Sequence, residues 1–339
     1  MPCSTGPTCT GRWSTRPPGC ASRCAADPRR SDMRIAVTGA AGYLGQAVLA
    51  RLHRDGHEVT AIGHRTPVDR PPGVFVRYAD LTDAAAATEA IAGADAVCHL
   101  AGRTRVRDSG GAVGRYYRDN LVATLNLLDA MTAGNRPARL VFLSSGAVYG
   151  RSGREPIAES HPTEPRSAYG ATKLAAEQAI SWYAAAGGLS AVSLRLFNAA
   201  GAVRPGSGPD GSTLIARALA VATGEETTLP INGDGTAVRD FVHVADVADA
   251  IALALSLPCR GAEVFNLGAV GASVLEVVSA VERVVGTSVP VEHKPANGAD
   301  QPWLLADTSA ARERLGWRPE RSTLESMIAD QWKSGSARG

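Results

Sequence analysis

Three polar side chains near the middle of the chain could together move a proton on and off a hydroxyl group. Ser145 ends the segment LVFLSS, in which an apolar run that starts at Leu140 is followed by two serines. Tyr169 and Lys173 come later, four residues apart in a sequence that favours a helix. This spacing is about one helical turn, so both side chains lie on the same face. If the three groups converge, the rest of the chain must supply a cofactor and a substrate site.

The main sign of a cofactor site is a glycine-rich segment near residue 40. RIAVT (Arg34–Thr38) predicts a short buried strand that runs into GAAGYLG (Gly39–Gly45), after which Leu44, Val48 and Leu52 recur at helical spacing. A strand, a glycine turn and a helix are the context of a dinucleotide site. The glycines let the backbone approach a pyrophosphate, and the helix N-terminus offers it free N–H groups. The spacing here is GxxGxxG rather than GxGxxG.

The second predicted strand, Glu58–Ile62, bears on the choice between NAD and NADP. About 20 residues after the glycines, NAD sites usually carry an acidic residue that binds the adenosine ribose. This chain has Gly63 in that place, followed by His64 and Arg65. A cation there can accept the 2′-phosphate of NADP, so these residues lean to NADP and leave NAD open. Asp80-Leu81, after the next strand, could flank the adenine.

The order of the predicted elements indicates the fold class. Strands alternate with helices six times, which is typical of an α/β protein with a parallel, doubly wound sheet of the Rossmann type. The predicted strands are Arg34–Thr38, Glu58–Ile62, Val74–Tyr78, Ala96–Leu100, Leu140–Leu143 and Ala191–Phe197. Helices are predicted at Tyr117–Met131 and Thr172–Ala186.

After Asn198 the pattern changes, beginning with a loop rich in glycine and proline at Gly201–Gly211. We therefore expect a dinucleotide-binding domain at residues 33–198 and a smaller α/β substrate lobe at residues 199–339, partly interwoven with the first. The helices predicted there are Leu214–Thr223, Val244–Leu257, Val274–Val285, Thr308–Leu315 and Leu324–Trp332, with strands at Thr228–Ile231 and Val264–Leu267.

The composition of the chain argues against two classes of partner, nucleic acids and membranes. The chain has 339 residues, of which 45% are hydrophobic, and a net charge of +2. Such a small charge argues against a nucleic-acid surface. No run of about 18 apolar residues is present, so we expect no membrane-spanning helix.

Residues 1–32 differ from the rest of the chain. They contain four of the six cysteines and several prolines, but no periodic apolar pattern and no apolar core of a secretory signal. We predict a disordered leader, or upstream sequence included by a wrong start, with Met33 as the natural start. The cysteine spacing matches no common zinc pattern, so no metal site is expected. Without a cysteine framework in the folded part, a reducing cytoplasm is favoured.

Six motifs occur in a familiar order and at suitable spacing. They are GAAGYLG, HLAG (His99–Gly102), SSGAVYG, Tyr169-x-x-x-Lys173, LRLFNAAG and GDGTAVRDFVHVADVADA. Together they resemble the extended short-chain dehydrogenase/reductase family, and within it the nucleotide-sugar epimerases of the UDP-glucose 4-epimerase type. The resemblance covers about Met33 to Trp332 and implies a tightly bound NAD.

The resemblance also implies residue roles. Tyr169 would be the catalytic acid/base, Lys173 would lower its pKa and bind the nicotinamide ribose, and Ser145 would hydrogen-bond the reacting hydroxyl. The implied cofactor-binding residues are Gly39, Gly42, Tyr43, Leu44, Gly45, His64, Arg65, Asp80, Leu81, Leu100, Ala101, Gly102, Asn120, Ser144, Tyr169 and Lys173. The implied substrate-binding residues are Ser145, Tyr169, Asn198, Thr213, Arg239 and Asp300.

Of these, Asn198 and Arg239 match positions that bind the diphosphate in the family, and Asp300 matches one near the nucleotide ribose. The chain also departs from the pattern of the family. Thr213, Asn232 and Asn297 stand where the family often has Asn, an aromatic residue and Arg, respectively.

The residues after Ser145 separate the reactions that this family performs. Dehydratases of the family usually carry an Asp-Glu pair there and decarboxylases often a Glu, whereas this chain has Gly146-Ala147. The remaining prediction is NAD(P)-dependent epimerisation of a nucleotide-sugar at C4 through a 4-keto intermediate. An NADPH-dependent 4-ketoreductase, and more remotely a non-catalytic dinucleotide sensor, are the alternatives. By resemblance, we expect a homodimer that pairs through the helices around Tyr117–Met131 and Thr172–Ala186.

Overall fold

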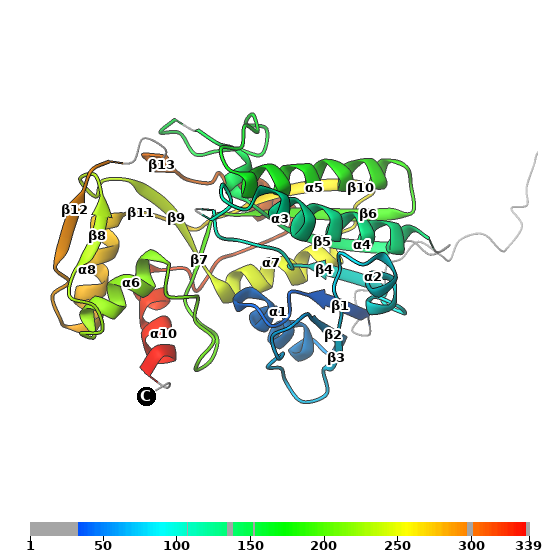
Figure 1. Cartoon of the computed structure of the whole chain (residues 1–339), viewed down its shortest axis with the longest axis horizontal. Helices are drawn as coiled ribbons and strands as arrows, with labels where there is room; N and C mark the ends of the chain where they lie inside the picture. Colours follow the sequence, from blue (N-terminus) through cyan, green and yellow to red (C-terminus); the bar gives the residue numbers. More distant parts are fainter. Residues whose placement is uncertain (1–32, 107, 134–137, 152, 297–300, 337–339) are drawn as a thin grey trace, which may run out of the picture. The chain divides into compact units, whose positions relative to one another are not determined.

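The main sheet is built from short apolar strands that are buried on both faces, as parallel strands require. Seven strands pair in parallel in the order β10-β6-β5-β4-β1-β2-β3 (Figure 1). Their bounds are β1 (Arg34–Thr38), β2 (Glu58–Gly63), β3 (Phe75–Tyr78), β4 (Ala96–His99), β5 (Ala138–Ser145), β6 (Leu189–Leu196) and β10 (Gly261–Leu267). The predicted Rossmann-type doubly wound sheet is confirmed.

The structure is a computed structural model that describes residues 33–106, 108–133, 138–151, 153–296 and 301–336. The predicted leader, residues 1–32, lies outside the described residues. Asn297 and Asp300 lie outside them too.

Helices cover both faces of this sheet. On one face lie α2 (Ala84–Ala90), α4 (Ala123–Thr132) and α5 (Ala168–Ala185), and on the other α1 (Tyr43–Arg54), α7 (Val244–Ser256) and α9 (Ser309–Arg314) (Figure 1). Each set forms its own apolar core with the strands. The sheet therefore separates two apolar cores, and the ends of its strands are where polar side chains can face a ligand.

The predicted helix Tyr117–Met131 is more complex than expected. The structure has α3 (Val113–Tyr116), a π-helical segment at Tyr117–Val122 and then α4. A π-helical segment adds a residue to the turn and is frequent at functional sites. Here it contains Asn120, whose buried side chain binds the backbone at Arg103.

The C-terminal part forms a smaller lobe with its own core. Its elements are β7 (Asn198–Ala200), α6 (Leu214–Ala222), β8 (Leu229–Asn232), β9 (Val238–His243), β11 (Val270–Ser273), α8 (Val274–Val285), β12 (Val291–Lys294), β13 (Trp303–Leu304) and α10 (Leu324–Ser336). Strands β11, β9, β13 and β7 form one sheet, and β12 pairs with β8. Between these elements, α7 and β10 return to the main sheet, so the division at residue 198 stays a prediction.

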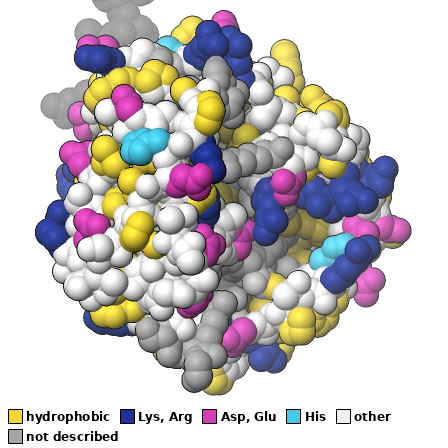
Figure 2. Space-filling model, turned by 60° about the vertical axis from the view of Figure 1, so that its left-hand side comes forward, with side chains coloured by type: hydrophobic (Ala, Val, Ile, Leu, Met, Phe, Trp, Pro, Cys, Tyr) yellow, Lys and Arg dark blue, Asp and Glu magenta, His cyan; other side chains and the backbone are white. Residues whose placement is uncertain are grey.

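The surface carries charges of both signs. On the face shown in Figure 2, basic and acidic side chains are scattered among uncharged ones. Among the helices of the described residues, none is long and apolar enough to cross a membrane.

The core on the α7 side gives a test of the fold. Trp317 is completely buried, and its indole N–H donates a 2.8 Å hydrogen bond to the Asp246 carbonyl. We predict that Trp317→Ala lowers the free energy of unfolding by about 3–5 kcal/mol, because a large cavity opens in the core. Urea denaturation measures this. Phe75→Ala, at a side chain that is 62% exposed, is the matched control and should change it by less than about 0.5 kcal/mol.

Candidate active site

The carboxyl ends of the parallel strands open into a cavity of about 1320 Å³. This edge is where ligands bind in doubly wound folds. All of the predicted site residues except Asn120, Arg239 and Asp300 line it. They are Gly39, Gly42, Tyr43, Leu44, Gly45, His64, Arg65, Asp80, Leu81, Leu100, Ala101, Gly102, Ser144, Ser145, Tyr169, Lys173, Asn198 and Thr213. The structure thus brings together residues that are up to 174 positions apart in the sequence.

The glycine turn between β1 and α1 packs tightly on itself and against the loop after β4, at positions where a side chain would meet backbone atoms. Gly39 has φ of +69°, and a Cβ there would lie 2.7 Å from the Ala101 nitrogen. A Cβ on Gly45 would lie 2.3 Å from the Gly39 oxygen. The first turn of α1 carries no acidic side chain, so its free N–H groups face the cavity without a competing anion. This geometry fits a pyrophosphate.

At the end of β2, Gly63 is required by its neighbours. A Cβ there would lie 2.8 Å from the Tyr78 ring, so an acidic side chain does not fit without a shift of that ring. His64 Nε2 lies 3.6 Å from an Asp80 oxygen. Hydrogen bonds from Thr82, followed by the charges of His64 and Arg65, hold the pKa of Asp80 below its usual value.

Ser145 and Tyr169 are brought together by a close helix–turn contact. Ser145 precedes the 3₁₀ turn Gly146–Val148, and its hydroxyl accepts the Ala147 N–H at 3.2 Å. Ser167 caps α5 by accepting the Gly170 N–H at 3.1 Å. A Cβ on Gly170 would lie 2.4 Å from the Ala147 oxygen, so only glycine lets α5 approach this closely.

The Tyr169 hydroxyl lies in a buried setting that opposes its ionisation. Burial raises the pKa of Tyr169, while its hydrogen bond with Ser145 lowers it. A tyrosine that must act as a base near neutral pH therefore needs a cation close to it.

Lys173 is the cation on the same helix. Its ammonium donates a 2.8 Å hydrogen bond to the Leu143 carbonyl and lies 4.6 Å from the centre of the Phe142 ring. Burial lowers the pKa of Lys173 to about 8, and the negative charge of Glu177 opposes that shift. Lys173 is thus close to a change of charge at physiological pH.

Asn120 lies behind the cavity and not in its wall. Its side-chain oxygen accepts the Arg103 N–H at 2.7 Å, and its amide nitrogen donates to the Arg103 carbonyl and to Thr172. A Cβ on Gly102 would lie 2.8 Å from the Asn120 oxygen. Asn120 therefore holds the loop that follows β4 against α5.

The predicted substrate residues divide into two groups. Asn198 lines the cavity, as does Thr213, whose buried hydroxyl has no hydrogen-bond partner among the described residues. Arg239 lies outside the cavity wall and donates to the carbonyls of Val238 and Gln301 at 2.9 and 2.7 Å. The proposed phosphate contact of Arg239 therefore stays a prediction, and Asp300 lies outside the described residues.

Four arginines in the cavity wall were missed by the sequence analysis. They are Arg103, Arg105, Arg115 and Arg118. Arg103 pairs with Asp119 at 2.5 Å, and Arg105 reaches Asp210 of the smaller lobe at 3.3 Å. For two of them the signal was present, because Arg103 and Arg105 follow HLAG directly, whereas Arg115 and Arg118 come later in the chain. These side chains can meet the phosphates of a cofactor or substrate.

The place beside Ser145 is tight for any side chain larger than glycine. A Cβ on Gly146 would lie 3.1 Å from the ring of Phe197, which also lines the cavity. A side chain there would require that ring to shift slightly. The geometry agrees with a reaction that does not remove a carbon-bound proton by a carboxylate at this position.

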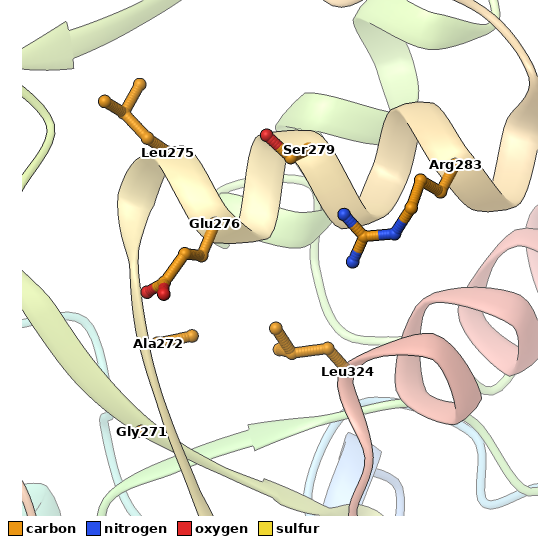
Figure 3. A pocket seen from close by; sticks show the side chains of 7 residues that line it. All are labelled: Gly271, Ala272, Leu275, Glu276, Ser279, Arg283 and Leu324. Atoms are coloured by element: carbon orange, nitrogen blue, oxygen red, sulfur yellow. The ribbon is translucent and has the colours of Figure 1, made fainter.

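A second hollow, of about 430 Å³, lies between α8 and the start of α10 (Figure 3). Glu276 and Arg283 extend from α8 beside it, near Leu324. Glu276 completes the capping box of α8 with Ser273, and Arg283 pairs with Glu325 at 3.0 Å. Its charged groups therefore already have structural partners.

Fold and cavity define a dinucleotide-binding α/β protein with a Ser-Tyr-Lys site at the ends of its strands. Residues 35–268 match the model of the NAD dependent epimerase/dehydratase family. The chain belongs to this family, within the extended short-chain dehydrogenases/reductases.

Known proteins of similar sequence and structure agree. A UDP-glucose 4-epimerase of Corynebacterium glutamicum is 40% identical over 320 residues, which is 91% of this chain and 97% of the relative. A crystal structure of a UDP-glucose-4-epimerase from Stenotrophomonas maltophila, with bound NAD and formylated UDP-arabinopyranose, superposes with a TM-score of 0.84. It is 33% identical, and the match covers 90% of this chain and 98% of that one. The enzyme of Bifidobacterium longum, in complex with NAD+ and UDP, has a TM-score of 0.81 at 32% identity, with coverages of 89% and 97%.

The charge of Lys173 predicts a pH dependence. Because burial lowers its pKa to about 8, the ammonium is present below that pH and lost above it. If the cation supports ionisation of Tyr169, kcat/KM should fall as the pH rises above about 8. Initial rates from pH 6 to pH 10 would measure this, with circular dichroism to show that the fold persists. A rate that stays constant to pH 10 would contradict the prediction.

Proposed function

We propose that this protein epimerises a nucleotide-sugar at C4 through a 4-keto intermediate. The observation that carries the proposal is the convergence of Ser145, Tyr169 and Lys173 on one cavity, with Gly146-Ala147 in place of acids. The related UDP-glucose 4-epimerases support the same reaction. By analogy with them, the substrate is UDP-glucose or UDP-galactose.

Each side chain has a distinct task in this reaction. Tyr169 takes the proton from the 4-hydroxyl as the C4 hydrogen leaves as hydride, and it returns the proton when hydride comes back to the other face. Ser145 hydrogen-bonds the sugar oxygen during both transfers. Lys173 supplies the positive charge that lowers the cost of the tyrosinate. A bound nicotinamide supplies the reversible acceptance of hydride.

We propose NAD as the cofactor. The turn at Gly39–Gly45 and the open N-terminus of α1 fit a pyrophosphate, and related structures contain NAD. His64 and Arg65 alone would favour NADP. However, the Asp80 carboxylate lies beside both cations and offsets the charge that a 2′-phosphate needs. Mass spectrometry of nucleotide released from the denatured protein distinguishes NAD from NADP.

The reaction itself is tested with purified protein and UDP-galactose, without added reductant. We expect UDP-glucose to accumulate to an equilibrium, because the hydride returns to the same substrate. Tyr169→Phe, which removes only the hydroxyl, should lower the rate at least about 100-fold while nucleotide stays bound. Turnover only of a 4-keto sugar with NADPH would instead identify a ketoreductase, and bound nucleotide without any turnover would indicate a sensor.

We further propose that the protein is a homodimer that pairs through α5 and the π-helical segment before α4. Three large apolar side chains on these elements are exposed, namely Trp182 (76%), Tyr117 (39%) and Val122 (39%). The contact between α5 and the π-helical segment makes their surfaces adjacent. An exposed apolar surface of this kind is typical of a protein interface.

Trp182→Glu should convert the dimer to a monomer, since a carboxylate in a dry interface loses its solvation. Sedimentation velocity measures the mass. Phe75→Glu is the matched control, because Phe75 is an exposed aromatic residue on edge strand β3, away from these helices. A wild-type protein that sediments as a monomer would refute the proposed dimer.

We also propose a cytoplasmic location. Cys98 and Cys259, the two cysteines among the described residues, are both free thiols. Free thiols are stable in a reducing compartment.

A further inference from the structure

A row of buried polar side chains starts at Ser144 in the wall of the active-site cavity and crosses three adjacent strands. Ser144 on β5 stands in register with Arg195 on β6, and Arg195 in register with Asn266 on β10. All three are almost completely buried. A buried arginine in a sheet needs a partner of opposite charge, since an unpaired buried charge is strongly destabilising.

Glu177 on α5 is that partner. Arg195 donates from Nη2 to Glu177 at 2.7 Å and from Nε to both carboxylate oxygens at 3.1 and 3.2 Å. The Ser144 hydroxyl donates to the same carboxylate. The side chain of Glu177 is only 6% exposed and that of Arg195 only 7%. One carboxylate therefore joins α5 to the ends of β5 and β6.

The far side of Arg195 is equally constrained. Its Nη1 donates to the Tyr149 hydroxyl at 2.8 Å, and the guanidinium stacks over the Tyr149 ring at 4.7 Å. The Tyr149 hydroxyl donates to Asn266 at 2.6 Å, and the Asn266 amide donates to the Ile157 carbonyl at 2.8 Å. The network thus reaches the segment that follows Ser145.

The same network adjoins two of the residues to which we assign catalysis. Glu177 lies one helical turn after Lys173 on α5, and Ser144 directly precedes Ser145. Lys173 in turn donates to the carbonyl of Leu143, the residue before Ser144. Lys173 and Glu177, one turn apart on α5, therefore form hydrogen bonds with the adjacent residues Leu143 and Ser144 of β5.

We propose that Glu177 and Arg195 are positioning residues, whose buried ion pair fixes α5 on the end of β5 and places a negative charge one turn from Lys173. The proposal rests on the function proposed above, in which Lys173 must carry a positive charge. The role of Arg195 is different: its hydrogen bonds to Glu177 hold that carboxylate in one orientation.

The charged groups around Lys173 support this assignment. On its own helix it faces Glu177, and Tyr169 lies one turn earlier. From β4 it faces His99, which is neutral because burial lowers its pKa to about 3. Glu177 is thus the group that favours the ammonium form of Lys173, against the effect of burial.

The chain offers an unusually direct test, because it has only three lysines: Lys173, Lys294 and Lys333. With lysine labelled by ¹³C at Cε, each residue gives its own NMR titration. We expect Lys173 to titrate at about pH 8 in the wild type and roughly one pH unit lower in Glu177→Gln. The alkaline limb of kcat/KM should move by the same amount.

Two variants separate charge from geometry. Glu177→Asp keeps the negative charge, so Lys173 should titrate close to its wild-type pH. The shorter side chain of Asp should nevertheless lower kcat. Glu177→Gln/Arg195→Met removes both charges and leaves no unpaired ion in the core, so it serves if the single variant does not fold. Because Glu177 is the charge that raises the pKa of Lys173, Lys173 should still titrate below its wild-type pH.

Arg34→Gln is the matched control. It breaks the ion pair of Arg34 with Asp95 (3.0 Å) at the start of β1, at the opposite ends of the strands, and should leave the titration and the kinetics unchanged. An unchanged titration of Lys173 in both Glu177→Gln and the double variant would overturn the proposal. The titration needs no turnover, so an inactive wild type would refute the epimerase function while the role of Glu177 is still measured.

Discussion

Seven strands that all run in one direction are the constraint on which the site depends. Parallel pairing places every strand's carboxyl end at one edge, and the cores of the helices close both faces of the sheet. The polar groups that face a ligand can therefore gather at that edge. The glycine turn after β1, the loop after β4 and Ser145 at the end of β5 meet there for this single reason.

The close approach of α5 to the turn after Ser145 sets the environment of the catalytic side chains. Gly170 lets α5 contact the turn after Ser145, and Tyr169 and Lys173 are buried as a consequence. Burial disfavours both the tyrosinate and the ammonium. The ion pair of Glu177 with Arg195 lies one turn further along α5, where its carboxylate offsets part of that effect for Lys173.

Local patterns predicted much of this fold correctly, and their errors have physical causes. Strand β1 and helix α8 have the predicted bounds, because β1 is an apolar run that ends at the glycine turn and α8 lies between its caps Ser273 and Gly286. The π-helical segment at Tyr117–Val122 was not predicted, since it goes with tertiary contacts of Asn120, to the loop at Arg103 and to Thr172 on α5. Strands β9 and β11 were not predicted, because β11 has only four residues and the adjacent Arg239 and Asp240 interrupt the apolar pattern of β9.

The sequence by itself determined the class of fold, the dinucleotide turn, the Ser-Tyr-Lys set and the absence of an acid beside Ser145. Each of these is a local pattern whose physical meaning needs few neighbours. Only the tertiary structure decided that Asn120 supports a loop behind the cavity, that Arg103 and Arg105 line it, and that β10 joins the main sheet. It also paired Glu177 with Arg195, 18 residues apart. Partners of this kind depend on how helices and strands pack, and no spacing in the chain specifies them.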